Sequence, residues 1–495
     1  MLSRREVVVL TLLFVASLPA VTARLYSSDE VQYYSYLRSL WFDRDVSFEN
    51  EYQYFYDHRI AQSADFHRTF LEFDTPTGRR INYGTMGCAI LWAPFYAAAD
   101  VATRVLRSAG RDIAADGYSR LYISAVAYGS AFYGFAAIVL SIAAARRVTG
   151  PTAFSSGVAV WVGTPLLFYM YIAPPFSHAC SAFAVALFVT IWLQVRGTWS
   201  IPGMVALGLA GALMAMVREQ DIFFVLGPAF DLGLALVLRK RLRPERWAGG
   251  KRRGAAPPSE SERGWGPASS ENSRHDLVRA GVAGVAAFVI GYLPQLLAYK
   301  ALNGKFGPSP LVTRKMYWNA PHALQVLADP QHGFFFWTPL AVLAVIGLVL
   351  LMAGRRASTT GAADTRRVAA CMLLMLGLQV YISGAVESWT VAGAFGQRRF
   401  VALTILLVVG IAALRAAVRA RPARVMINVM VGLSVWWNVA LMAEFGTSMM
   451  DRQRLELRRN AYDAFVTLPR MAPELVYRYF ASRSSFYKPS TPEAR

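Results

Sequence analysis

The stretch Tyr26-Ser27-Ser28-Asp29-Glu30-Val31-Gln32-Tyr33-Tyr34 directly follows the first long apolar run of the chain, Val7–Ala23. Two arginines precede that run, and because positively charged flanks stay in the cytoplasm, we expect its helix to run outward. A charge inside the hydrocarbon core costs several kcal/mol, so the adjacent acids Asp29 and Glu30 should lie just outside the membrane. The pair is therefore predicted at the outer mouth of a membrane-embedded helix bundle. Val21-Thr22-Ala23 also matches a signal-peptidase site, but cleavage there would leave the acids on the same side.

The composition of the whole chain supports a membrane protein. Of its 495 residues 55% are hydrophobic and only 17% are charged, whereas a soluble domain carries about 25% charged residues. A bilayer-spanning helix needs about 20 apolar residues. Further apolar runs of about this length fall near 120–144, 151–173, 178–195, 201–217, 222–238, 277–298, 334–353, 368–386, 400–418 and 425–443. The sequence thus predicts an all-α integral membrane protein, a polytopic bundle of about eleven transmembrane helices.

The positive charges indicate how the bundle is oriented. The net charge is +20, but Lys and Arg form short clusters between the apolar runs, as the orientation rule for membrane proteins predicts. We therefore exclude nucleic acid as a partner and place the basic loops in the cytoplasm. The same rule predicts that Asp29-Glu30 and the other acidic or aromatic loops lie outside.

Four regions follow from this pattern. Residues 1–238 form an N-terminal transmembrane module, whose long outer loop 24–117 is rich in aromatic and acidic residues and should fold into an extracytoplasmic cap of short helices. Within the loop, Tyr83–Val105 is predicted to be re-entrant or interfacial, because it contains Asp100 and Arg104. Residues 239–279 read as a flexible basic cytoplasmic linker. Residues 280–443 form a C-terminal transmembrane module, and 444–495 an interfacial tail.

Asp29 and Glu30 are the candidate catalytic residues. General-base chemistry needs a carboxylate within hydrogen-bond reach of an acceptor hydroxyl and partly shielded from water. An acid just past a helix end, under an aromatic cap, meets both needs. The alternative is structural: Ser28 would cap the next helix, with both acids in its favoured first turn.

Other candidate binding residues lie in the outer loops. Tyr83 and Trp92 belong to stretches that mix glycine and aromatics, which can stack on sugar rings, or which anchor a helix at the interface. His178 follows a tight turn and could donate to a phosphate or cap its helix. Arg218 lies in a short charged turn and could hold a lipid phosphate or form an ion pair.

The stretch Trp389 to Phe400 contains the candidate binding residue Trp389 and, near its end, the twin arginines Arg398 and Arg399 at an outer membrane boundary. Positive charge on the outer side departs from the orientation rule and requires a reason. Because a guanidinium group matches a phosphate with two hydrogen bonds, a lipid-linked phosphate is the ligand we expect there.

With these residues in view, the chain resembles the GT-C superfamily of polytopic glycosyltransferases, such as the protein O-mannosyltransferases and the lipid A aminoarabinose transferase. The resemblance lies in three short motifs: Ser28-Asp29-Glu30-x-x-Tyr33, Gly87-x-x-x-Leu91-Trp92-x-Pro94-Phe95 and Trp389-x-x-x-Gly393-x-Phe395-Gly-x-Arg398-Arg399. It implies a polyprenyl-phosphate sugar as donor. It also implies Asp29 as the base or acceptor-organising acid, with Glu30 beside it, and Arg398 and Arg399 as phosphate ligands. The chain lacks the inserted soluble domain of the protein O-mannosyltransferases, which leaves the acceptor open between a glycan, a lipid and a protein.

Two further classes remain as alternatives: a transporter or flippase for a lipid-linked glycan, and a binding scaffold without chemistry. A divalent cation is a further candidate ligand, but no metal-ligating residues are predicted, because the three cysteines are far apart and have no Cys/His spacing. Catalysis requires Asp29 to face the same cavity as Arg398 or Arg399. A transporter requires a polar path toward Arg146 or the 239–279 side.

Overall fold

The computed structural model describes residues 2–61, 63–241, 274–354, 362–391 and 393–486. Within them the protein is all-helical, with two isolated β-bridges, Asp74 to Arg80 and Met316 to Val386. The predicted all-α class is therefore confirmed. The α-helices are α1 (Arg4–Ser17), α2 (Ser28–Arg38), α3 (Glu49–Asp57), α4 (Ala64–Phe66), α5 (Gly87–Ser108), α6 (Arg120–Thr149), α7 (Ala153–Val162), α8 (Leu166–Tyr171), α9 (His178–Val195), α10 (Ile201–Val217), α11 (Leu226–Arg241), α12 (Arg274–Asn303), α13 (Pro310–Thr313), α14 (Ala323–Ala328), α15 (Phe334–Trp337), α16 (Leu340–Met352), α17 (Ala362–Ala385), α18 (Thr404–Ala417), α19 (Arg421–Gly446), α20 (Leu457–Tyr462) and α21 (Leu468–Ala481).

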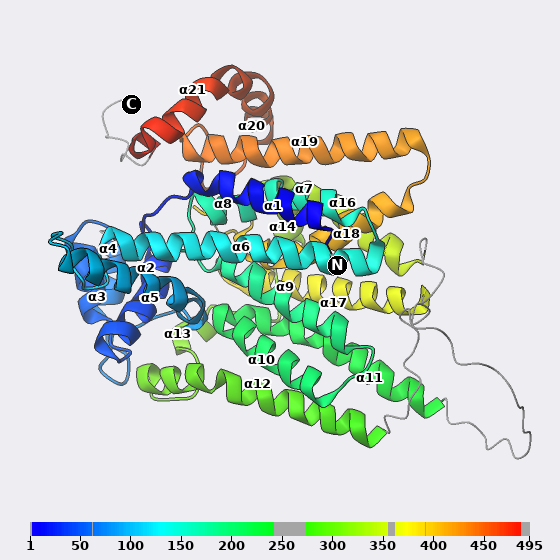
Figure 1. The fold of residues 1–495 in the computed structure, drawn as a ribbon, viewed down its shortest axis with the longest axis horizontal. Helices are drawn as coiled ribbons and strands as arrows, with labels where there is room; N and C mark the ends of the chain where they lie inside the picture. The colour runs from blue at the N-terminus through cyan, green and yellow to red at the C-terminus, as the bar shows by residue number, and fades with distance from the viewer. Residues whose placement is uncertain (1, 62, 242–273, 355–361, 392, 487–495) are drawn as a thin grey trace, which may run out of the picture.

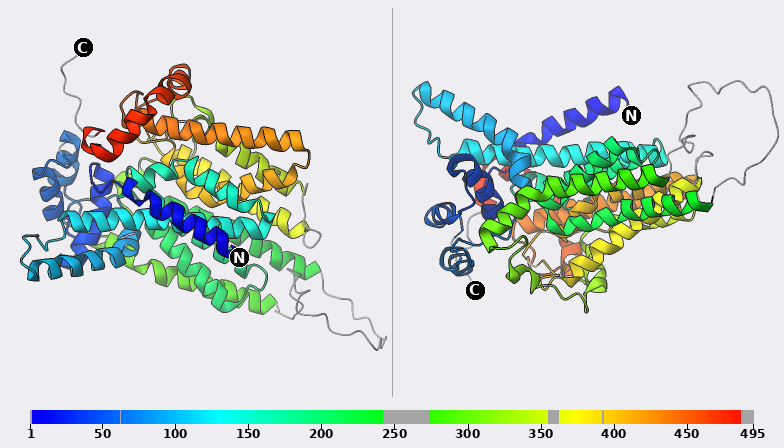
Figure 2. Two further views of the ribbon diagram at one scale, coloured as in Figure 1. Left: turned by 45° about the horizontal axis from the view of Figure 1, so that its top comes forward. Right: turned by 90° about the horizontal axis from the view of Figure 1, so that it is seen from below.

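The long helices run side by side and give the bundle two distinct ends (Figures 1 and 2). Helices α2 to α4 gather at one end, here called the cap end, and the tail helices α20 and α21 lie at the same end, on α19 (Figure 1). The segment around α18 is 89% buried and lies in the core, whereas α12 is 22% buried and lies at the rim. The predicted cap of short helices is therefore present.

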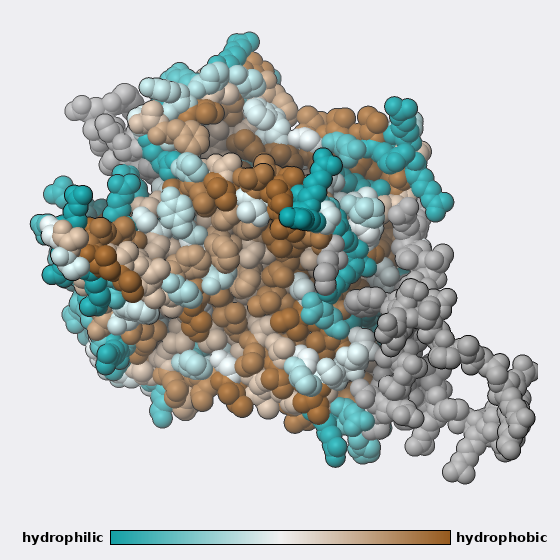
Figure 3. Space-filling model, viewed as in Figure 1, coloured by the Kyte–Doolittle hydropathy of each residue, from teal (hydrophilic) through white to brown (hydrophobic). Residues whose placement is uncertain are grey.

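Among the described residues, eight helical segments are long and apolar enough to cross a membrane, and three shorter apolar helices accompany them. Hydrophobic side chains cover the middle of the molecular face, and hydrophilic ones gather toward its two ends (Figure 3). The chain is thus a multi-pass membrane protein. The number of spans stays a prediction, because α1 has only 14 residues and is shorter than the length a span needs.

Two predicted apolar runs are broken helices rather than continuous ones. The run 151–173 divides into α7 and α8 at Gly163-Thr164-Pro165, and the run 334–353 divides into α15 and α16 at Thr338-Pro339. In each case a proline precedes the second helix. Proline lacks an N–H donor and disfavours the helical conformation of the residue before it.

Helix α5 coincides with the segment predicted to be re-entrant or interfacial. It is long enough to span, but its hydrogen bonds to α6 involve only the first half of that helix. Trp92 donates to Ser130 Oγ over 2.8 Å, and the Tyr122 hydroxyl donates to Asp100 over 2.6 Å. Helix α5 therefore accompanies the first half of α6 at the cap end; whether it spans the membrane or lies at the interface stays a prediction.

The predicted linker 239–279 falls largely outside the described residues, which resume at 274. There α12 begins at Arg274, within the range assigned to the linker, and continues to Asn303. The helix therefore begins several residues before the boundary placed at 280, and where its membrane-spanning part starts stays a prediction.

Candidate active site

A cavity of about 510 Å³ opens at the cap end between the two halves of the chain. Its polar wall comes from the start of α2, the turns before α5 and α9, the turn after α10, and the segment between α17 and α18. The residues of that wall are Asp29, Gln32, Tyr33, Tyr83, Thr85, Ser177, His178, Arg218, Glu219, Gln220, Lys315, Ser388, Arg398 and Arg399. Six of the nine predicted site residues therefore line one cavity.

The first turn of α2 determines how Asp29 is presented. Ser27 caps the helix, and its side chain accepts from the backbone N–H of Glu30 while the Glu30 side chain accepts from the backbone of Ser27. This reciprocal capping box fixes the helix start. Asp29, one position earlier, faces the cavity, where Arg398 Nη1 lies 2.8 Å from its Oδ2. The structural alternative placed the cap at Ser28; in the structure it is Ser27.

Glu30 does not line the cavity. It is fully buried, and its Oε2 accepts from the backbone N–H groups of Tyr26 and Ser27, over 2.8 Å and 3.0 Å. Its Oε1 has no hydrogen-bond partner in the described structure. Burial raises the pKa of this carboxyl group to about 8. The residue is a helix cap, and the geometry offers no route by which it could reach a substrate.

The segment before α18 turns sharply to deliver the twin arginines. Gly396 has φ +62°, a conformation that favours glycine, and an added Cβ there would lie 2.7 Å from Pro165. The guanidinium of Arg398 lies against the Phe176 ring, 5.6 Å from its centre. Arg399 is more buried and donates to the backbone oxygen of Ser388 over 2.9 Å and to its hydroxyl over 3.1 Å. The protein therefore holds both arginines in fixed positions.

Arg218 and His178 both line the cavity, and their side chains are in contact. Arg218 Nη1 lies 2.7 Å from His178 Nδ1 and 3.3 Å from the Ser177 hydroxyl. An arginine is always a donor, so this ring nitrogen accepts and the imidazole is neutral. His178 is also the first residue of α9. No side chain caps this helix, so the capping role is not seen; His178 lines the cavity instead, and its contact with a phosphate stays a prediction.

The three predicted aromatic ligands differ in position. Tyr83 lines the cavity, with the Lys315 ammonium 5.8 Å from its ring centre. Trp92 is buried in the packing of α5 against α6, where its indole donates to Ser130. Trp389 stacks on His322 outside the cavity, with ring centres 5.3 Å apart. Trp92 and Trp389 are thus structural aromatic residues, because their rings are used in packing between helices or loops.

Several lining residues were not predicted as ligands. Lys315 lines the cavity because the segment after α13 pairs with the segment after α17. In this pairing the backbone N–H of Glu387 donates to the backbone oxygen of Lys315 over 2.8 Å. Gln32 lies one turn after Asp29 on the same face of α2, a spacing that could have indicated it. Phe176 and Glu219 also line the cavity. They lie in the same turns as His178 and Arg218, but no local sequence pattern indicates that their side chains face it.

The lining of the cavity combines charged and apolar side chains. Four basic side chains (Arg218, Lys315, Arg398 and Arg399) line it with only two carboxylates (Asp29 and Glu219), which favours an anionic ligand. Apolar side chains line it as well and include Trp318, which is 43% exposed. Further apolar lining residues are Phe223, Leu311, Val312, Met316, Ile382 and Val386. The arrangement therefore suits an amphipathic molecule with a negatively charged head.

No group of three or more His, Cys, Asp or Glu residues in the described parts of the chain lies close enough together to hold a metal ion. The cysteines Cys88, Cys180 and Cys371 are free and buried. The two carboxylates of the cavity do not by themselves form a cation site, so we assign no step to a divalent cation.

Comparisons with known proteins give similarity at the level of structure and not of sequence. No protein-family model matches the chain, and no curated protein matches it at the sequence level. Among solved structures, the fold is similar to a crystal structure of ArnT from Cupriavidus metallidurans bound to undecaprenyl phosphate. The TM-score is 0.45 and the identity 14%, over 97% of this chain and 77% of that one. Because agreement at this level is partial, the function is inferred from the cavity itself.

Proposed function

We propose that the protein is a membrane glycosyltransferase of the GT-C type, which moves a sugar from a polyprenyl-phosphate donor to an acceptor hydroxyl at the cap end, on the extracytoplasmic face of a bacterial inner membrane. One observation carries the proposal. Asp29 and Arg398, from opposite halves of the chain, are ion-paired in a cavity that also contains Arg218 and Arg399. A base and a phosphate site thus lie within reach of one bound molecule.

The shape of the cavity supports a lipid-linked donor over a soluble one. The basic lining residues would bind the phosphate, and guanidinium groups suit that role because they can donate two parallel hydrogen bonds. The apolar lining residues, among them the partly exposed Trp318, would contact the prenyl chain. A water-soluble sugar phosphate would leave these apolar side chains without a partner.

The reaction needs one proton transfer and one bond exchange. The acceptor oxygen attacks the anomeric carbon of the sugar, and its proton passes to Asp29. The bond between that carbon and the phosphate oxygen breaks, and the oxygen leaves with the polyprenyl phosphate, which gains negative charge. Arg398, Arg399 and Arg218 stabilise that charge where it develops.

The pair between Asp29 and Arg398 indicates an order for these events. In the unliganded cavity Arg398 engages an oxygen of Asp29 over 2.8 Å. A donor phosphate competes for the same guanidinium, and by drawing Arg398 away it frees the carboxylate to accept a proton. Asp29 is thus expected to become an effective base only after the donor has bound.

A panel of polyprenyl-phosphate sugars tests the proposal. The purified protein is incubated with each donor, and the release of polyprenyl phosphate is followed for the unchanged protein, Asp29→Asn and Glu30→Gln. The loss of a general base lowers turnover by about 100-fold or more, so we expect this for Asp29→Asn. Glu30→Gln is the control, because it changes a neighbouring acid outside the cavity. Its turnover should stay within about threefold of normal.

Two results would contradict the proposal. Full turnover by Asp29→Asn would remove the base assignment. A chain that consumes no donor but carries lipid-linked glycan across vesicles would favour the transporter alternative, although the lining residues include none at the end of the bundle where Arg146 pairs with Glu6.

A further inference from the structure

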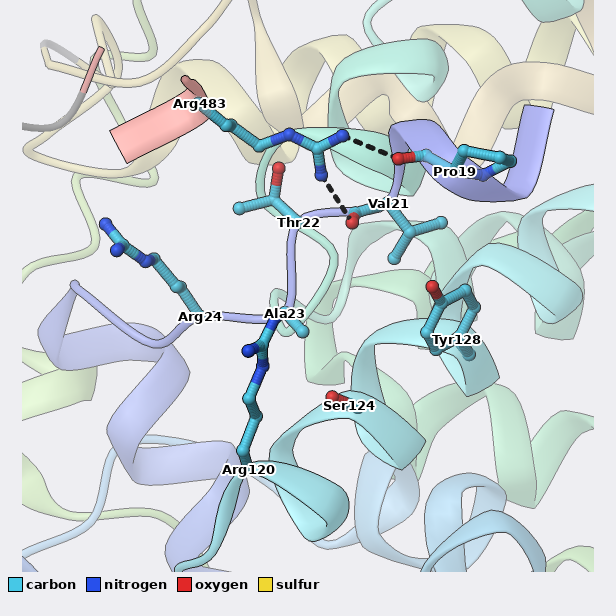
Figure 4. A pocket seen from close by; sticks show the side chains of 9 residues that line it. All are labelled: Pro19, Val21, Thr22, Ala23, Arg24, Arg120, Ser124, Tyr128 and Arg483. Carbon is cyan, nitrogen blue, oxygen red and sulfur yellow. Dashed lines mark hydrogen bonds between the residues drawn. The ribbon is translucent and has the colours of Figure 1, made fainter. Parts of the chain in front are cut away.

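A second cavity of about 390 Å³ lies between the first turns of α6 and the segment that joins α1 to α2 (Figure 4). It shares no lining residue with the candidate active site. Three arginines line it, Arg24, Arg120 and Arg483, and among the described residues its lining contains no carboxylate. This cavity is therefore more strongly basic in character than the first one.

Helix α6 supplies a row of polar groups along this cavity. Arg120, Ser124 and Tyr128 stand on successive turns, on the side that faces residues 19–24 (Figure 4). Arg120 is the first residue of a 30-residue helix, so the positive end of the helix dipole adds to its charge. It is exposed, and no carboxylate of the described chain pairs with it.

The tail of the chain fixes the rim of the cavity. Arg483 donates to the backbone oxygens of Val21, over 2.8 Å, and of Pro19 (Figure 4). These bonds use its donors and leave its positive charge in place beside the cavity. Arg24 adds a further positive charge from the segment before α2. An anion in this cavity would therefore be attracted from three sides.

The surroundings indicate that the anion is attached to a lipid. Tyr128 is 39% exposed and lies two turns below Arg120, a distance of about 12 Å along the helix. One further turn on, Phe132 is also exposed, as is Leu13 on α1. A ligand whose phosphate contacts Arg120 would thus have an apolar helix surface beneath it, in the direction of the bilayer.

We propose that this cavity binds the phosphate of an anionic membrane lipid. Arg120 contributes the guanidinium that contacts the phosphate, and the hydroxyls of Ser124 and Tyr128 donate to its oxygens. Arg24 and Arg483 exclude headgroups that end in a positive charge, such as choline. The site is independent of the proposed catalytic function, since it uses none of the same residues.

Native mass spectrometry of the detergent-purified full chain tests this site. The protein is mixed with phosphatidylglycerol or phosphatidylcholine, and the bound lipid is counted. We expect the unchanged protein to retain phosphatidylglycerol preferentially. Arg120→Gln should reduce that retention about tenfold, as expected for the loss of a charged hydrogen bond. Ser124→Ala should reduce it less.

The matched control is Arg107→Gln, an exposed arginine in α5, which should retain as much lipid as the unchanged protein. Excess inorganic phosphate distinguishes the two sources of the ligand. Lipid that stays bound assigns the site to a whole lipid, and lipid that is displaced assigns it to the phosphate group alone. Equal retention by Arg120→Gln and the unchanged protein, with equal unfolding temperatures, would overturn the proposal, as would equal retention of both lipids.

Discussion

Asp29 and Glu30 are neighbours in the sequence, but they lie in opposite environments. Successive residues of a helix point about 100° apart, so one side chain of the pair faces the cavity while the other enters the packed cap. Asp29 keeps 39% of its side chain exposed and pairs with Arg398, whereas Glu30 is fully buried. Two residues of the same chemical type therefore differ in role: Glu30 stabilises a helix start, whereas Asp29 is available to the cavity and is the proposed base.

The burial of Glu30 predicts a pH-dependent stability. Its pKa of about 8 in the folded protein lies above the ordinary value of 4.5, so the folded state holds a proton that the unfolded chain releases. Stability should therefore fall as the pH rises from about 4.5 to about 8, and level off above that. Thermal unfolding in detergent between about pH 6 and pH 9 measures this loss.

The control for this prediction is Glu30→Gln, which keeps the shape and cannot ionise. Its unfolding temperature should fall less across the same pH range, and at the alkaline end it should exceed that of the unchanged protein. If both proteins lost stability in parallel, another group would be responsible.

Arg398→Lys tests whether the geometry of the guanidinium, and not only its charge, holds the donor. Lysine keeps the charge but offers no planar pair of donors. We expect KM for the lipid-linked donor to rise about tenfold, with a smaller change in kcat. Steady-state kinetics at varied donor concentration gives both values.

The matched control here is Arg314→Lys, an exposed arginine in the loop after α13 that does not line the cavity. Its kinetics should be unchanged. An unaltered KM for Arg398→Lys would mean that the donor phosphate is bound elsewhere.

At the scale of elements, α16 and α18 approach each other backbone to backbone. A Cβ added at Gly347 would lie 1.8 Å from the backbone oxygen of Gly410, and one added at Gly410 would lie 2.2 Å from that of Ala344. Small residues at a helix crossing permit this close approach in membrane proteins. Because α18 continues from the segment with Arg398 and Arg399, the crossing also supports the cavity.

We predict that Gly347→Ala destabilises the protein by about 1–3 kcal/mol, because the helices must move apart to accept the methyl group. The unfolding temperature in detergent should fall accordingly. Gly377→Ala, in α17, is the control: nothing lies within 4 Å of the added Cβ, and the helix should gain about 0.5–1 kcal/mol. A neutral result at Gly347 would show that the crossing is looser than the structure indicates.

At the scale of the whole molecule, the C-terminal tail contacts the segment between α1 and α2 at the cap end (Figure 1). Arg483 donates to backbone oxygens at Pro19 and Val21, and the Tyr479 hydroxyl donates to Ala20 over 2.7 Å. The tail helix α21 thus holds the segment between α1 and α2. This segment leads directly into the helix start that presents Asp29.

Arg483→Ala is therefore expected to lower stability by about 1.5–3 kcal/mol, through the loss of charged hydrogen bonds. A thermal scan of the purified protein checks this. Arg470→Ala, an exposed arginine in the adjacent helix α21, should have little effect. Equal shifts for the two variants would indicate a general effect of charge and not a specific contact.

The sequence by itself determined the class of the protein and the parts of its site. Apolar runs, basic loops and an acid pair at a helix start depend on nearest neighbours along the chain and on the solvent, and these act locally. They predicted the membrane helices and the cap. That Asp29 shares a cavity with Arg398 and Arg399 was a requirement of the catalytic hypothesis, and the structure meets it. The helix breaks at Pro165 and Pro339 also have a local cause, the proline itself, but the apolar runs alone do not reveal them.

Only the tertiary structure decided which side chains face the cavity. The side of a helix that Glu30 or Trp92 occupies depends on what packs against it, and Lys315 reaches the cavity through pairing with a segment far away in the sequence. Such contacts depend on how the helices close on one another, and no local pattern records that. The second basic cavity likewise exists only because α6 and the tail both lie against residues 19–24.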